Sequence, residues 1–275
     1  MKNFSVLMSL YIKEKPEFAR MCFDSLLNQT VQAEEWVIIE DGPLSQEMYA
    51  LLEEYQRKKP GLIKRVPLKK NMGLGEALRI GVIKCKNELI ARMDTDDIAK
   101  EDRFEKQLSV FEENKRLDIC GSQIDEFENT INHIVARRTV PIKHEDIVQY
   151  QKRRDAFNHM TVMFKKTSVV NSGNYMHCPL MEDTYLWVRM IMNNCQCMNI
   201  DESLVYARVG HDMFDRRGGW DYLKKYIIGR KMVKETGFIS TFDFVYTVLV
   251  QIIVTLVPTS AREWLFKKVL HSKKK

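Results

Sequence analysis

Short apolar runs alternate with amphipathic stretches along the first hundred residues. Strand-forming residues run from Phe4 to Leu10, and apolar residues at helical spacing follow from Pro16 to Leu27. The pattern recurs, with further strands expected at 36–39, 62–67 and 88–93 and further helices at 46–58 and 74–84. This alternation predicts a largely parallel sheet covered on both faces, with ligands bound beyond the carboxyl ends of the strands.

The pattern loosens after a helix expected at 103–114. Strands with a hairpin are expected at 119–127 and 131–140, followed by a strand at 161–164, a helix at 182–193 and a last strand at 203–209. The chain has no linker rich in Gly, Pro or Ser and no internal repeat. A single domain up to about Gly219 is therefore expected.

The segment Asp94-Thr95-Asp96-Asp97 carries three carboxylates at the end of an expected strand. Alternate side chains there can converge on one hard cation, and oxygen-only ligands favour Mg²⁺ or Mn²⁺ over zinc. A divalent cation would stabilise a diphosphate leaving group. The alternative is a solvated acidic turn, which any D-x-D triplet can form.

Two other segments have ambiguous meanings by themselves. Gly73 and Gly75 precede and begin a helix that carries Arg79, an arrangement suited to phosphate, although a helix cap with a surface arginine has the same sequence. Spacing excludes a Rossmann dinucleotide fingerprint. Asp41, before Gly42 at a strand end, could accept a hydrogen bond from a base or ribose, or simply form a turn.

Taken together, five segments occur in the order and approximate spacing of the family 2 inverting glycosyltransferases. They are Ser5 to Tyr11, Ser25 to Thr30, Val37 to Gly42, Asn71-x-Gly73 and Asp94 to Asp97. The resemblance covers roughly the first 220 residues and is far more specific than any single segment. It implies an α/β protein of GT-A fold, in which a Rossmann-like nucleotide-binding half meets an acceptor-binding half across a mixed central sheet.

The resemblance also implies roles for donor residues. Asp41 would contact the nucleobase, Asp94 the ribose, and Asp96 a Mn²⁺ or Mg²⁺ ion on the diphosphate. The other donor-binding candidates are Ser9, Tyr11 and Arg79.

Met181-Glu182-Asp183 resembles the family's E-D motif, in which the aspartate is the general base. A positioned carboxylate is needed to take the proton of an acceptor hydroxyl. Without the family context, a pair of carboxylates stabilised by a helix dipole would be the better interpretation. Glu182 and His159 are the acceptor-side candidates, and His159 could equally be a core histidine.

Arg216 and Arg217, followed by two glycines, suit a loop that closes on the donor diphosphate. The segment departs from the Q-x-x-R-W motif of processive polysaccharide synthases, so we expect one sugar to be transferred per encounter. His211 is a further candidate for the metal.

The end of the chain, 220–275, predicts helices that associate with a membrane. Phe242 to Val257 is apolar but too short to span a bilayer, and a basic amphipathic stretch with Trp264 follows. Such a tail suits the inner face of the cytoplasmic membrane, although an apolar helix packed on the domain is the alternative. A membrane location would make a polyprenyl-diphosphate-linked saccharide the natural acceptor.

Composition excludes fewer classes of protein than the motifs do. The chain has 275 residues, a formal net charge of +6 and six scattered cysteines, which we expect to be reduced thiols of a cytoplasmic protein without a zinc site. The first residues run directly into an expected strand, so we expect no signal peptide. The charge fits anionic partners, and we expect none of them to be nucleic acid.

We therefore expect an inverting hexosyltransferase of O-antigen or capsule biosynthesis, with residues 1–219 as the catalytic domain and a UDP-hexose as the donor. Two alternatives remain open. One is a metal-dependent phosphohydrolase that uses the cluster from Asp94 to Asp97, and the other is a catalytically silent membrane-associated module with the same fold.

Overall fold

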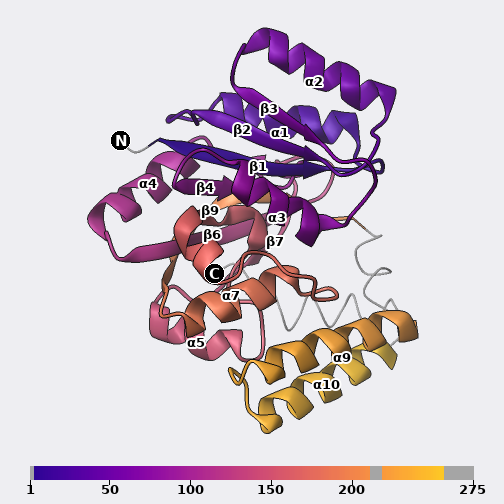
Figure 1. The fold of residues 1–275 in the computed structure, drawn as a ribbon, viewed down its shortest axis with the longest axis vertical. Coiled ribbons are helices and arrows are strands. Elements are labelled where there is room, and N and C mark those ends of the chain that lie inside the picture. Colours follow the sequence, from indigo (N-terminus) through magenta and orange to yellow (C-terminus); the bar gives the residue numbers. More distant parts are fainter. Residues whose placement is uncertain (1–2, 211–218, 257–275) are drawn as a thin grey trace.

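The computed structural model describes residues 3–210 and 219–256. Its centre is a nine-stranded mixed sheet of order β3-β2-β1-β4-β8-β6-β9-β5, with β7 paired to β6 (Figure 1). Strands β3, β2, β1 and β4 run parallel, whereas β8 is antiparallel to both β4 and β6. The expected mixed α/β architecture is confirmed.

The first half of the chain follows the expected alternation closely. Its elements are β1 (Phe4–Leu10), α1 (Pro16–Leu27), β2 (Glu35–Glu40), α2 (Gln46–Lys58), β3 (Ile63–Pro67), α3 (Leu74–Lys84) and β4 (Leu89–Arg92). Because parallel strands all end at the same edge, the segments after β1, β2 and β4 converge there.

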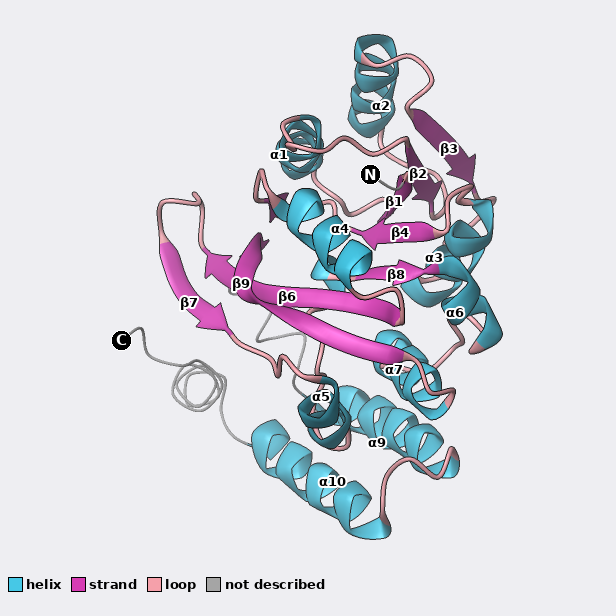
Figure 2. Cartoon of the chain, turned by 90° about the vertical axis from the view of Figure 1, so that its left-hand side faces the viewer, coloured by secondary structure: helices cyan, strands magenta, loops and turns pink. Residues whose placement is uncertain are grey.

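Alternation along the strands divides the core into two layers. On β1, Val6 and Met8 pack with helices α1, α2 and α4, whereas Leu7 packs with α3 on the opposite face. Trp187 of α7 lies in the same layer as α3. Both faces of the sheet are therefore covered, as Figure 2 shows.

The second half is less regular than the sequence predicts. It contains β5 (Ile98–Ala99), α4 (Arg103–Glu113), β6 (Leu117–Phe127), β7 (Ile134–Arg138), α5 (His144–Gln151), η1 (His159–Thr161), β8 (Met163–Lys165), α6 (Lys166–Asn171), α7 (Glu182–Met192) and β9 (Gln196–Arg208). The expected strand at 161–164 is a 3₁₀ turn followed by β8, and β9 starts well before residue 203. Helices α5 and α6 were not expected, because eight and six residues carry too few apolar positions to establish a period.

Helices α9 (Gly219–Glu235) and α10 (Thr241–Leu256) lie side by side at the end of the molecule opposite α2 (Figures 1 and 2). Val233 of α9 and Ile239 pack against Val188 of α7, so the helical pair is attached to the domain through a small apolar cluster. Among residues 3–210 and 219–256, we find no helix with the length and apolar character needed to cross a bilayer. All six cysteines are buried and free, as expected.

Helix α3 approaches the sheet so closely that Gly81 has no room for a side chain. A Cβ there would lie 2.3 Å from Cδ1 of Leu7 and 3.1 Å from Cγ1 of Ile39. We predict that Gly81→Ala lowers the free energy of unfolding by about 1–3 kcal/mol, since overpacking outweighs the better helix propensity of alanine. Urea denaturation measures this effect. Ile83→Ala, at an exposed position on the same helix, is the control and should change stability little.

Candidate active site

The acidic turn after β4 gathers three carboxylates at the carboxyl edge of the sheet. One oxygen from each of Asp94, Asp96 and Asp97 lies within 4.8 Å of the others. The Asp94 and Asp96 side chains are partly exposed, whereas Asp97 is buried. The geometry suits one cation held by oxygen ligands alone.

Three arginines surround this turn with positive charge. The buried Arg92 guanidinium forms an ion pair with Asp94. Arg208, at the end of β9, donates its backbone N–H to Oδ1 of Asp97 (2.7 Å) and its Nε–H to the carbonyl of Asp96 (3.0 Å). Arg103, fully buried at the start of α4, donates to the carbonyl of Arg92 at 2.7 Å. The turn is thus fixed from β4, β9 and α4.

Crowding of like charges makes the turn receptive to a cation. Burial and the neighbouring Asp94 charge raise the pKa of Asp96 to about 6. Burial and the charges of Asp96 and Asp94 raise the pKa of Asp97 well above its usual range. A bound divalent cation would relieve this repulsion and keep the carboxylates ionised, so the residues present fit a hard metal ion.

The Asp41 side chain fastens the loop before α3 to the end of β2. Its two carboxylate oxygens accept the backbone N–H groups of Met72 (2.6 Å) and Gly73 (3.0 Å). Gly42 follows with φ of +87°, and a Cβ there would lie 2.7 Å from the backbone nitrogen of Asn71. The Asp-Gly turn is therefore built around this loop contact, which sequence reasoning did not foresee.

Helix α7 brings the second acidic pair next to the beginning of α3. A Cβ at Gly75 would lie 2.6 Å from Cγ of Glu182, so only glycine admits the Glu182 side chain here. Asp183 follows, with about a quarter of its side chain exposed. The E-D pair thus contacts the helix that begins at the donor-side glycines.

Arg92 and Tyr175 link Asp183 electrostatically with the acidic turn. Buried Tyr175 lies close enough to both for the charges of Asp183 and Asp94 to add to the rise in its pKa, which burial mainly causes. Arg92, which pairs with Asp94, also acts on Asp183 by opposing the rise in its pKa. Arg92 and Tyr175 therefore lie within electrostatic range of both Asp94 and Asp183.

His159 is a partly buried residue beside Asp183. Its Nε2 is hydrogen-bonded to the Tyr175 hydroxyl at 2.8 Å, and its Nδ1 lies 3.8 Å from Oδ2 of Asp183. Burial, with a smaller contribution from Arg92, lowers the pKa of His159 well below its usual range. Its ring also packs on Trp187, so the core and acceptor-side interpretations of this histidine are compatible.

The positions of the other predicted residues give less information about their roles. Arg79 forms a bidentate ion pair with Glu76 one turn earlier on α3, and this pair does not include a residue of the acidic turn. Ser9 is partly buried near the carboxyl end of β1, and Tyr11 follows that strand. Arg216 and Arg217, together with His211, lie outside the described residues.

Sequence reasoning did not single out Arg92, Arg208 or Asp155 as parts of the site. An arginine inside the expected strand at 88–93, two residues before Asp94, was the one available signal, because an unpaired charge is rarely buried. Arg208 contacts Asp96, 112 positions away, and Asp155 accepts a hydrogen bond from the hydroxyl of Thr184, 29 positions away and next to Asp183; no local pattern reports either contact.

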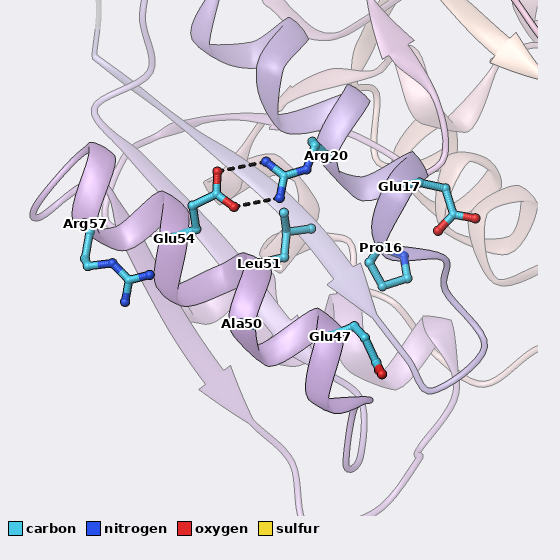
Figure 3. Close-up of a pocket in the computed structure, with 8 residues that line it drawn as sticks. All are labelled: Pro16, Glu17, Arg20, Glu47, Ala50, Leu51, Glu54 and Arg57. Carbon is cyan, nitrogen blue, oxygen red and sulfur yellow. Dashed lines mark hydrogen bonds and ion pairs between the residues drawn. The ribbon is translucent and has the colours of Figure 1, made fainter.

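A groove of about 560 Å³ lies between α1 and α2 rather than at the acidic turn (Figure 3). Arg20 and Glu54 close it with a bidentate ion pair, so its charges largely satisfy one another. We assign no role in the reaction to this groove.

Comparison with known proteins agrees with this geometry. The model of the family described as glycosyl transferase family 2 matches residues 5–169. The chain is 38% identical to the amylovoran biosynthesis glycosyltransferase AmsE of Erwinia amylovora, over 96% of this chain and 98% of that protein. It is 36% identical to the UDP-Gal:α-D-GlcNAc-diphosphoundecaprenol β-1,3-galactosyltransferase of Escherichia coli, over 98% and 97%.

A solved structure shares the fold at low identity. The mannosyltransferase PcManGT of Pyrobaculum calidifontis, solved with GDP-mannose and Mn²⁺, superposes with a TM-score of 0.62 at 10% identity, covering 94% of this chain and 78% of that one. Family membership also removes the basis for the phosphohydrolase alternative. The chain belongs to glycosyl transferase family 2 and is a glycosyltransferase of GT-A fold.

Proposed function

We propose that this enzyme transfers one hexose from a UDP-hexose to a lipid-linked saccharide during surface-polysaccharide synthesis, with inversion at the anomeric carbon. The observation that carries the proposal is the Asp183 carboxylate, whose pKa is raised to about 7 and which shares the neighbouring Arg92 with Asp94 of the acidic turn. A group with such a pKa is ionised often enough near neutral pH to accept a proton and basic enough to hold it.

The donor would lie over the carboxyl ends of β1, β2 and β4. Asp41 would contact the nucleobase with lone pairs left free by its two loop hydrogen bonds, since each carboxylate oxygen can accept more than one. Asp94 would bind the ribose, and Ser9, Tyr11 and Arg79 would complete the pocket. Arg216 and Arg217 would contact the diphosphate.

We propose that Mn²⁺ or Mg²⁺ binds at the acidic turn, with Asp96 as its principal ligand. When bound, the ion would stabilise the negative charge on the departing nucleoside diphosphate. Asp97 is buried, and its Oδ1 already accepts the Arg208 N–H, which supports a role in shaping the turn.

Transfer would take place in a single displacement. Asp183 takes the proton of an acceptor hydroxyl as that oxygen bonds to the anomeric carbon, and the bond from this carbon to the donor phosphate oxygen breaks. The electron pair leaves with the nucleoside diphosphate. Attack opposite the leaving group converts an α-linked donor into a β-linked product. Glu182 and His159 would contact the acceptor.

The lipid-linked acceptor is supported by the Escherichia coli relative, whose name specifies a diphosphoundecaprenol-linked substrate. An exposed apolar stripe on α10, formed by Phe242, Val245, Tyr246, Leu249, Val250 and Ile253, supports the matching location. Exposed apolar patches of this kind mark interaction surfaces. We propose that residues 1–219 form the catalytic domain and that 220–275 rest on the inner face of the cytoplasmic membrane.

Asp183→Asn should reduce turnover by about 10²–10⁴-fold, because the amide cannot accept the proton. The measurement is steady-state transfer from UDP-galactose to a GlcNAc-diphosphate lipid, with donor binding followed by calorimetry. Donor affinity should stay near that of the wild type. Full activity of the variant would remove Asp183 from the mechanism, and an inactive wild-type chain across a panel of nucleotide sugars would favour a catalytically silent module.

Asp96→Asn should abolish the stabilisation of the protein by donor and metal together. For the wild type, UDP-hexose at about 100 times its Kd with Mn²⁺ should raise Tm by roughly 5–10 °C. Differential scanning fluorimetry with and without EDTA measures the shift. Asp102→Asn, at a half-exposed carboxylate paired with Lys106, is the control and should keep the rise in Tm caused by donor and metal. An EDTA-insensitive shift would contradict the metal assignment.

Replacing the α10 stripe should release the protein from lipid. The triple variant Phe242→Ser, Leu249→Ser, Ile253→Ser should lower partition onto anionic phospholipid vesicles at least about tenfold, because three exposed apolar side chains no longer enter the bilayer surface. Vesicle co-sedimentation measures this partition. The single variant Ile83→Ser, at an exposed apolar position on α3, should leave it unchanged. Equal binding by wild type and triple variant would contradict the location.

A further inference from the structure

Asp183 is connected to a second carboxylate that has no role in the function proposed above. Thr184, the next residue on α7, donates its backbone N–H to Oδ1 of Asp183 at 2.7 Å. Its side-chain hydroxyl donates to Oδ1 of Asp155, in the loop after α5. One threonine therefore bridges two carboxylates from segments 28 residues apart.

The C-terminal helices hold the Asp155 loop in place. Arg230 of α9 is buried and donates to the carbonyl of Lys152 at 2.7 Å and to the hydroxyl of Thr247 at 3.1 Å. Arg153 donates to Oδ1 of Asp243 at 2.7 Å. These bonds tie residues 152–153 to both α9 and α10, so Asp155 is a fixed neighbour of the site.

The same helices also support the segment that leads into α7. A Cβ at Gly229 of α9 would lie 2.8 Å from the carbonyl oxygen of Pro179, and the Cys178 thiol is directed at the Gly229 carbonyl. Both carboxylates of the bridge are therefore positioned against one helix. Side-chain hydrogen bonds of this kind set the geometry of a reacting group.

We propose that Asp155 and Thr184 are positioning residues for Asp183: Thr184 orients the Asp183 carboxylate, and the negative charge of Asp155 strengthens it as a base. The proposal rests on Asp183 being the base. Like charges close together disfavour the ionised form of each, so Asp155 increases the affinity of Asp183 for a proton.

The charged and titratable groups around Asp183 agree with this direction. They are Asp155 from the loop after α5, Glu182 on α7, Arg92 on β4, His159 on η1, and Tyr175 and Cys178 before α7. Burial contributes most to the raised pKa of Asp183, Asp155 is next, and the Thr184 N–H and Arg92 oppose the rise. His159 is neutral, so it adds no positive charge.

The test is a titration of Asp183 that does not require substrate. In protein labelled with ¹³C at aspartate carboxyl groups, the resonance missing from Asp183→Asn belongs to Asp183 and should titrate near pH 7 in the wild type. In Asp155→Asn the midpoint should fall by about one pH unit, because the like charge is gone. The asparagine at position 155 can still accept a hydrogen bond from the Thr184 hydroxyl. Asp146→Asn, an exposed carboxylate on α5, is the control and should leave the midpoint unchanged.

Kinetics provide the second measurement. The base must be ionised, so turnover should fall as the pH drops through the Asp183 midpoint. In Asp155→Asn this acidic limb of the pH–rate profile should move to lower pH, and the maximal turnover at high pH should be lower. Thr184→Val should lower the plateau about tenfold, and Thr184→Ser, which keeps the hydroxyl, should restore it. If these variants are as thermally stable as the wild type, their lower turnover comes from the position of Asp183 and not from loss of folded protein.

Different results would overturn the positioning role of Asp155 and the role of Asp183 as the base. An unchanged Asp183 midpoint and pH profile in folded Asp155→Asn would overturn the positioning role while leaving Asp183→Asn inactive. An active Asp183→Asn enzyme would instead overturn the proposed base, whatever Asp155 does.

Discussion

The structure of the site depends on holding several carboxylates closer together than their mutual repulsion allows in isolation. Asp94, Asp96 and Asp97 crowd one turn, and Asp183 with Asp155 forms a second acidic group nearby. Arg92 offsets part of this charge from inside the protein: its guanidinium pairs with Asp94 and favours the ionised form of Asp183. Because an isolated buried charge is very costly, neither the arginine nor the acids would be stable there without the other.

The sheet makes this concentration of charge possible. Parallel strands β1, β2 and β4 end at one edge, so the residues that follow them converge without any long-range recognition between the loops. The antiparallel strand β8 follows η1, which carries His159, and His159 contacts both Tyr175 and Asp183. A glycosyltransferase needs donor and acceptor to meet in one place, and the mixed sheet brings the two halves together.

The helical pair α9 and α10 has two surfaces with different contacts. One is anchored to the domain by Arg230 and by the pair of Arg153 with Asp243, next to the acceptor side. The other presents apolar side chains to the surroundings. A segment that resembles a simple anchor in the sequence thus also braces the loop that carries Asp155.

The sequence alone determined the strand and helix order of the first half and the acidic turn, because these follow from local periodicity and from residues within a few positions of one another. It also determined the family, because five short segments between Ser5 and Asp97 keep the family's order and spacing. It also pointed to Asp183 through a motif at a helix start. Only the tertiary structure decided that Asp41 holds the loop before α3, that Arg208 supports the acidic turn, and that Asp155 reaches Asp183 through Thr184. These contacts join residues some thirty to more than a hundred positions apart, and their side-chain types occur in many surface positions. Nothing local distinguishes them until folding brings their partners together.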